Sequence, residues 1–346
     1  MAKVKGRHKG IKYFLIETTK SLFQEGIGKS KHLAMQKSYA RNRTRETPAI
    51  YSYSTYDTYK EVVAKFADFL ESEYNLRFEK DFRKLSTNEI ASCLDHYFEV
   101  QKEKHLAKKT LEKHISALRK VLSAIDEKIK EHFTPDARAK WRDGVETQDC
   151  DRYNNSNKIL EHLKQIDETS YAIANLQRLV GCRIGDVKKI EINEQEQKVY
   201  IRKSKGGRDR CVYFDRFQED FERVKECKEI LDKALETKRF SEIRKNEYYN
   251  NLRKACKRAD EIYHGSHAFR YEFAQNRYDE ISRWTQEEQE EYYLRILLDR
   301  GKSQKDIEKA FKEVREKNAV AEAIVSEELG HSRLDISRHY LKIRAK

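Results

Sequence analysis

Apolar residues recur at helical spacing along most of the chain, whereas a strand-like pattern appears in one stretch. In residues 107–126 apolar side chains fall at positions 111, 115, 118, 122 and 125, which predicts a helix with one buried stripe. Residues 188–215 contain short β-type runs separated by turns, and the strands predicted there are 189–192, 198–202 and 209–214. Because the sequence has only 12 Gly and 2 Pro, few breakers interrupt its helices. We therefore predict a mainly α fold with a small antiparallel three-stranded sheet.

Changes in composition divide the sequence into four parts. Residues 1–47 form a basic leader, in which apolar residues at 11, 14, 15, 22 and 23 predict one short amphipathic helix. Residues 48–145 read as a helical domain. The polar stretch 146–158 is rich in Asn and Asp, which is typical of a linker. Residues 159–346 form a second, α+β domain that begins with helix and contains the predicted sheet.

The charge of the chain indicates a polyanionic partner. The formal net charge is +13, and the leader alone holds 12 Lys and Arg against three Glu. Nucleic acid is the partner that this distribution favours, although a basic surface can also serve solubility alone. No apolar run of about 18 residues and no apolar segment typical of a secretory signal occurs, so we expect a cytoplasmic protein. The six cysteines lack Cys-x-x-Cys spacing, which favours reduced thiols over disulfides or a zinc site.

The predicted helix at 107–126 carries a basic face beside its apolar stripe. The cations that lie off the stripe are Lys108, Lys109, Lys113, Arg119 and Lys120. A helix with one buried face and one basic face can lie in a DNA major groove with its cations on phosphates. The same pattern also fits a solvated surface, so the face alone does not decide between the two.

Residues suited to breaking a phosphodiester bond occur in a fixed order in the second domain. Cleavage without a metal needs a nucleophile, cations for the non-bridging oxygens and an acid for the leaving oxygen. Arg suits the oxygens because its guanidinium is bidentate, Lys or His can move the proton, and a Tyr hydroxyl can attack phosphorus. The candidates are Arg183, Lys205 in a Gly-containing turn, His267 and Arg270 three residues apart, His331, and Tyr340 nine residues after it.

Each candidate has an ordinary structural explanation when it is taken alone. Arg183 could form a structural ion pair, and Lys205 could be a solvated turn lysine, with Lys203, on the strand rather than in the turn, as its competitor. Tyr340 could simply pack at the end of a helix. The order and spacing of the whole set favour a catalytic site over coincidence.

The set resembles the tyrosine recombinases, also known as the phage integrase family. The boxes that match are GxRxxE/D (Gly181, Arg183, Asp186), the hairpin lysine (Lys205), H-x-x-R (His267, Arg270) and LGHS with its tyrosine (Leu329, Gly330, His331, Ser332, Tyr340). The resemblance covers residues 49–346 in architecture and 180–346 in motifs. The 60 residues between Arg270 and His331 exceed the gap in compact members, so we expect 276–328 to be an insertion of extra helices.

The resemblance implies a role for each matched residue. Tyr340 would attack phosphorus and form a 3′-phosphotyrosyl link. Arg183 and Arg270 would hold the scissile phosphate. Lys205 would protonate the 5′-hydroxyl leaving group, and His267 would transfer the tyrosine proton. His331 would donate a hydrogen bond to the phosphate. Asp186 would orient a partner such as His331. No metal or other cofactor is expected.

The resemblance also implies an architecture and partners. The helical core-binding domain and the catalytic domain would form a C-shaped clamp on duplex DNA with inverted-repeat half-sites. Copies that are monomers or weak dimers when free would assemble as a homo-tetramer on DNA, with a DNA-bending or directionality factor as an accessory. Integration or excision of a mobile element is the expected role. A type IB topoisomerase, a telomere resolvase and a non-catalytic DNA-binding protein remain alternatives, and His267 favours a recombinase over the topoisomerase.

Overall fold

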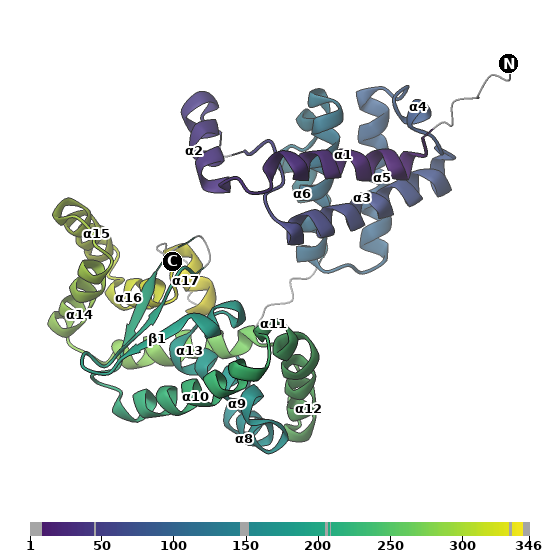
Figure 1. Cartoon of the computed structure of the whole chain (residues 1–346). Coiled ribbons are helices and arrows are strands. Elements are labelled where there is room, and N and C mark those ends of the chain that lie inside the picture. The colour runs from purple at the N-terminus through teal and green to yellow at the C-terminus, as the bar shows by residue number, and fades with distance from the viewer. Residues whose placement is uncertain are drawn as a thin grey trace. The chain divides into compact units, whose positions relative to one another are not determined.

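The computed structural model describes residues 9–44, 46–145, 152–204, 207, 209–331 and 334–341, except for the side chains of 245, 246, 335–337 and 339. The chain divides into two units, Met1–Asp149 and Cys150–Lys346. Both are built mainly from helices, which confirms the predicted fold class (Figure 1). Each unit has a hydrophobic core made only by its own residues.

Apart from an isolated β-bridge between Gly10 and Phe78, the regular elements of the first unit are helices in its described residues. Its elements are α1 (Ile11–Gly26), α2 (Lys31–Asn42), α3 (Tyr53–Tyr74), α4 (Glu79–Phe82), α5 (Thr87–Glu103), α6 (Lys108–Ile125), the 3-10 helix η1 (Glu127–His132) and α7 (Pro135–Lys140). Helix α5 starts at a capping box, in which Ser86 accepts from the Glu89 amide while the Glu89 carboxylate accepts from the Ser86 amide. The apolar stripe predicted on α6 is buried, because Leu111, Leu118 and Leu122 have no exposed surface.

The basic leader does not form a separate part of the chain. Helix α1 packs against α3 and α6, and Leu15 is fully buried in the same core as Phe66 and Leu118. The boundary predicted at residue 47 is therefore wrong for this helix. Helix α1 packs onto this core because its apolar face can be removed from water only there.

The second unit holds the sheet and the longer run of helices. Its elements are α8 (Ser156–Ile166), α9 (Glu168–Val180), the 3-10 helix η2 (Ile184–Lys189), β1 (Ile190–Asn193), β2 (Lys198–Ile201), β3 (Arg210–Tyr213), α10 (Gln218–Thr237), α11 (Phe240–Glu242), the π-helix η3 (Ile243–Tyr248), α12 (Tyr249–Ala259), α13 (His267–Ile281), α14 (Gln286–Asp299), α15 (Gln304–Glu316), α16 (Val320–Glu328) and α17 (Leu334–Leu341).

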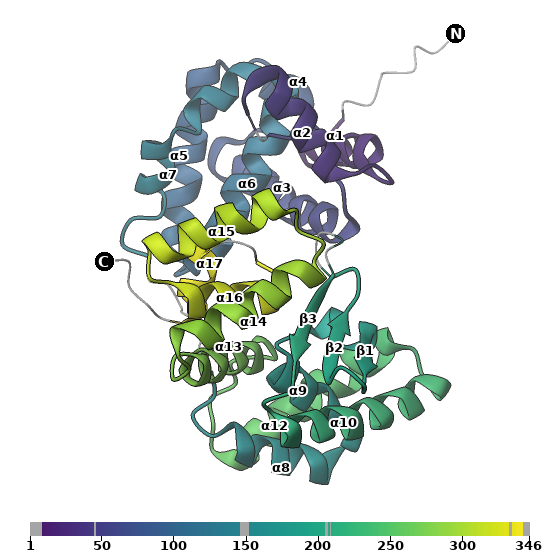
Figure 2. The ribbon, with the colours of Figure 1, turned by 90° about the vertical axis from the view of Figure 1, so that its left-hand side faces the viewer.

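The sheet has the antiparallel order β1-β2-β3, and its strands match the three predicted from the sequence (Figure 2). The register pairs Ile190 with Ile201 and Val199 with Val212. Strand β3 is buried along its whole length, so its residues belong to the core of the unit. The sheet therefore anchors the segment that follows α9 to the helices that follow β3.

One predicted boundary in the second unit needs correction. Helix α8 starts at Ser156, inside the predicted linker, because the Asn155 side chain accepts a hydrogen bond from the Lys158 amide and caps the helix. The segment 276–328, predicted to be an insertion of extra helices, contributes to the core of the unit. Helix α16 is buried at every residue and packs against β3, α13, α14 and α17. The remainder of the predicted linker, 146–151, lies outside the described residues.

Two expectations from composition concern cysteines and membranes. The five cysteines within the described ranges carry free, buried thiols, and Cys150 lies outside these ranges. Among the described residues, no helix has the length and apolar character needed to span a bilayer.

The placement of α1 leads to a stability prediction. Leu15→Ala should lower the free energy of unfolding of the first unit by about 2–5 kcal/mol, because it leaves a cavity in a closed core. Tyr13→Ala on the same helix should have little effect, since Tyr13 is 54% exposed. In a Trp284→Phe background, urea unfolding followed by fluorescence reports on Trp141, which is buried in this core. Equal stabilities of the two variants would contradict the assignment of α1 to the core.

Candidate active site

Four of the predicted site residues lie together at the end of the second unit. His267 and Arg270 are one turn apart on α13 and therefore share a helix face. His331 follows α16 through Gly330, whose positive φ of 74° turns the chain back toward α13. Tyr340 comes from α17, which packs on both α13 and α16. Residues separated by more than seventy positions in the sequence thus meet at one point.

The Tyr340 hydroxyl contacts two of these residues directly. It lies 2.8 Å from His267 Nε2, and Arg270 Nε donates to it at 3.4 Å. Because arginine can only donate, the phenol oxygen accepts from Arg270 and can donate its own hydrogen to His267. Tyr340 is 6% exposed, so water has little access to this pair of contacts.

Further contacts hold Tyr340 in this position. Its ring stacks on Tyr271 with centroids 4.4 Å apart, and Gln275 Nε2 donates to its main-chain carbonyl at 3.2 Å. Two residues earlier, Arg338 pairs with Glu322 of α16 at 2.7 Å. The hydroxyl is therefore placed by packing and polar contacts on both sides of α17.

Arg270 is fully buried and ties together the segments around the site. Its Nη atoms donate to the main-chain carbonyls of Gly181 and Leu329, the latter at 2.7 Å, and Nη2 lies 3.0 Å from His331 Nε2. Since arginine is a donor only, His331 Nε2 must accept, so this nitrogen carries no proton. Burial, followed by the positive charges of Arg270 and Arg183, lowers the pKa of His331 to about 3.

Arg183 lies at the start of η2 and belongs to a short polar chain. Its Nη1 donates to Ser204 Oγ at 3.4 Å, and Ser204 Oγ donates to Asp186 at 2.7 Å. Burial alone would raise the pKa of Asp186, but hydrogen bonds from Ser204 and Lys189 outweigh it and the pKa is lowered. In these described contacts Asp186 orients Ser204 and Lys189, which differs from the expected contact to His331.

The predicted hairpin lysine, Lys205, lies outside the described residues, and its role stays a prediction. The hairpin on either side of it is held in place. Lys203 adopts a positive φ of 43°, its amide donates to Asp209 at 2.8 Å, and its carbonyl accepts from Lys189 at 2.7 Å. The hydrogen bonds of the Lys203 main chain therefore hold the start of the turn, next to Ser204.

Sequence reasoning missed Arg210, on β3. Its guanidinium is 2% exposed and donates to the main-chain carbonyls of Glu328 and, at 3.3 Å, Gly181. Burial and the neighbouring charge of Arg270 lower the pKa of Arg210 to about 9. The available signal was a cation inside an otherwise apolar strand, RCVY, which predicts a specific buried partner.

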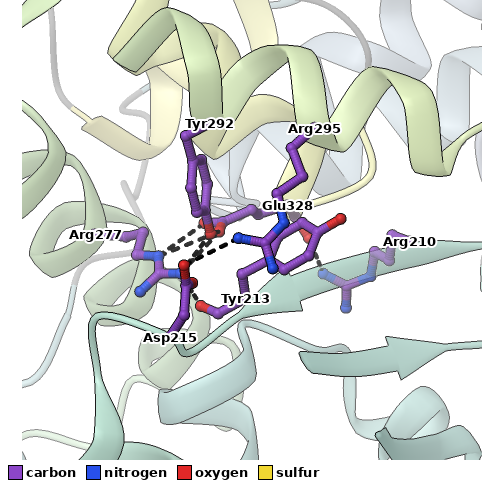
Figure 3. Close-up of polar contacts among 7 residues, drawn as sticks. All are labelled: Arg210, Tyr213, Asp215, Arg277, Tyr292, Arg295 and Glu328. Carbon is purple, nitrogen blue, oxygen red and sulfur yellow. Dashed lines mark hydrogen bonds and ion pairs between the residues drawn. The ribbon is translucent and has the colours of Figure 1, made fainter. Parts of the chain in front are cut away.

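A third buried arginine, Arg277, joins β3 to the helices (Figure 3). Arg277 pairs with the fully buried Glu328 at 3.0 Å and donates to the Tyr213 carbonyl at 2.6 Å. Tyr292 from α14 donates to the same carboxylate at 2.7 Å. The Glu328 side chain thus binds α13 and α14, and its main-chain carbonyl accepts a hydrogen bond from Arg210 of β3.

The cations predicted to contact DNA from α6 are not equivalent. Lys109 and Lys113 are exposed and Lys108 is half-buried. Arg119 instead pairs with Glu46, and Lys120 donates to the Thr47 carbonyl. The last two are therefore engaged within the first unit, because the segment before α3 folds over this end of α6.

The solved structures that are similar to this chain include two recombinases. The crystal structure of XerA recombinase is 15% identical, with a TM-score of 0.35, and the match covers 91% of this chain and 95% of that one. A post-cleavage complex of XerH site-specific recombinase with palindromic difH is 16% identical, with a TM-score of 0.46 and coverage of 95% and 90%. No protein-family model and no curated protein matches the sequence.

The environment of His331 leads to a prediction about its titration. Because its pKa lies near 3 when folded and near 6.5 in an unfolded chain, its ring should stay neutral from pH 8 to below pH 5. The stability it contributes is complete above about pH 6.5 and is lost as the pH falls toward 3, since only the unfolded chain takes up the proton in that range. An NMR titration of the histidine resonances, with His331→Gln for assignment, should show a neutral His331 ring over this pH range. A titration midpoint near pH 6.5 would contradict the lowered pKa.

Proposed function

We propose that this protein is a DNA strand-breaking and rejoining enzyme, a site-specific tyrosine recombinase with Tyr340 as its nucleophile. The observation that carries the proposal is the contact of one buried phenol with both His267 and Arg270. A packing tyrosine needs neither partner, whereas a nucleophile needs a base for its proton and a cation for the phosphate it attacks.

The proposed reaction follows from these contacts. Tyr340 Oη attacks phosphorus, its proton passes to His267 Nε2, and the new P–O bond replaces the bond to the 5′-oxygen of the next nucleotide. That oxygen leaves as a hydroxyl after receiving a proton, for which Lys205 is the proposed donor. One P–O bond forms as another breaks, so a 5′-hydroxyl can reverse the step and reseal DNA without ATP.

Charge stabilisation is the task of the arginines. Arg183 and Arg270 would bind the non-bridging oxygens, because the negative charge on them grows as the tyrosine attacks. The neutral His331 accepts from Arg270 through Nε2, which leaves its other ring nitrogen as the donor toward the phosphate. Asp186 would act one step away, through Ser204 and the Arg183 side chain.

The partners proposed are those of a recombinase. The substrate is duplex DNA with inverted-repeat half-sites, gripped by the helical unit and the catalytic unit as a clamp, and exchange takes place in a homo-tetramer. The exposed lysines of α6 supply phosphate contacts from the first unit. Movement of a mobile element, with an accessory DNA-bending or directionality factor, is the proposed biological role.

The nucleophile can be tested with a nicked suicide duplex whose half-site is selected from a random pool by the purified protein. In EDTA, the wild-type protein should give a covalent adduct on a denaturing gel, and Tyr340→Phe should give none while DNA affinity stays unchanged. Tyr271→Phe is the matched control, because it removes the neighbouring phenol and keeps the stacked ring. An adduct that persists in Tyr340→Phe, or depends on Tyr271, would refute the assignment.

Further substrates separate the alternatives. Two selected sites on one plasmid should yield recombinant products. Relaxation of a supercoiled plasmid that lacks the site would indicate a topoisomerase, and covalently closed hairpin ends would indicate a telomere resolvase. Tight binding by the wild-type protein with no adduct on any substrate would indicate a non-catalytic DNA-binding protein.

The proposed contacts of the helical unit have their own test. Lys109→Ala and Lys113→Ala should each weaken DNA binding and reduce the slope of log affinity against log salt by about one, the amount expected for one lost phosphate contact. Lys12→Ala is the control, since Lys12 is an exposed lysine already paired with Asp68. Unchanged salt slopes in the α6 variants would remove this helix from the interface.

A further inference from the structure

Arg210 is a buried cation whose described partners are main-chain carbonyls. It donates to the carbonyl of Glu328 at the end of α16 and to that of Gly181 at the end of α9. Its Nε has no hydrogen-bond partner among the described residues, and no carboxylate within them forms an ion pair with it. No carboxylate among the described residues contacts this guanidinium, and the charge of Asp186 acts on it only through space.

Arg277 shows how the same unit buries an arginine for structure alone. It is also buried, with 6% of its surface exposed against 2% for Arg210, yet it faces the Glu328 carboxylate and donates to two further oxygens (Figure 3). Its charge is therefore compensated inside the protein. Burial of a charge that contacts no carboxylate costs more than burial of a directly paired one, so the difference between the two arginines needs a reason.

The position of Arg210 supplies that reason. It shares the Gly181 carbonyl with Arg270, and the two arginines bind consecutive carbonyls, of Glu328 and Leu329, just before His331. A side chain at Gly330 would lie 3.1 Å from Arg210 Cδ, so Arg210 also forms the floor beneath this turn. Arg210 therefore braces the turn that carries His331 and adds positive charge behind Arg270.

We propose that Arg210 is a positioning residue of the site: without touching DNA, it fixes the His331 turn against Gly181 and adds the positive charge that a bound phosphate compensates. This inference rests on the function proposed above. It predicts that loss of Arg210 slows the chemical step more than it weakens DNA binding.

The test compares Arg210→Met, which keeps the length of the side chain, with Arg210→Lys, which keeps its charge. Arg216→Met is the control, because Arg216 is a half-exposed arginine paired with Glu288. Arg210→Met should slow single-turnover adduct formation by about tenfold or more while the Kd for DNA changes less than about threefold. Arg210→Lys should recover part of the rate, and Arg216→Met should match the wild type.

The titration of His331 in the DNA-free protein gives a second readout that does not depend on catalysis. In Arg210→Met its pKa should rise by about one unit, because a nearby positive charge is lost. In Arg210→Lys it should stay close to the wild-type value. An arginine whose charge is neutralised within the protein would leave the pKa of His331 the same in both variants.

The outcomes distinguish the two proposals. If the wild-type protein forms no adduct, the proposed function fails, and the His331 titration alone decides the role of Arg210. Wild-type rate and wild-type titration in Arg210→Met would overturn the inference. If Arg210→Met does not fold, Arg210→Lys decides: a slowed rate with an unshifted His331 supports the bracing role, and a wild-type rate overturns it.

Discussion

The packing of the second unit depends on the hydrogen bonds that the buried guanidinium of Arg270 makes. A fully buried cation must find acceptors, and Arg270 finds them in the carbonyls of Gly181 and Leu329, in His331 and in the Tyr340 hydroxyl. Gly181 accepts this approach because its positive φ of 61° ends α9, and a Cβ there would collide with Phe273 at 2.3 Å. The same interaction therefore closes the core and assembles the candidate site.

The helices that follow α13 are part of this assembly. Glu328 holds Arg277 and Tyr292 through its carboxylate, and its carbonyl holds Arg210. Helix α16 thus cannot shift without disturbing both the ion pair behind the site and the turn before His331. The segment that sequence spacing marked as an insertion is for this reason a support of the site.

Much of this arrangement could be predicted from local sequence signals. The strands, the stripe of α6 and the i, i+3 placement of His267 and Arg270 depend on neighbouring residues, so periodicity and turn chemistry were sufficient. The packing of α1 onto α3, the burial of α16 and the role of Arg210 depend on contacts between distant segments. A cation in a strand does not reveal which carbonyls it will meet, because these are set by tertiary packing.

The elements that carry the site residues are held through different contacts. Helix α16 is buried at every residue, and the carbonyls of Glu328 and Leu329 at its end accept hydrogen bonds from Arg210 and Arg270. Helix α17 is held, among its described side chains, by the stacking of Tyr340 on Tyr271, by the contact of Gln275 with the Tyr340 carbonyl and by the pair of Arg338 with Glu322. The Tyr340 hydroxyl adds its contacts with His267 and Arg270, so α13 binds both the tyrosine and the turn that carries His331.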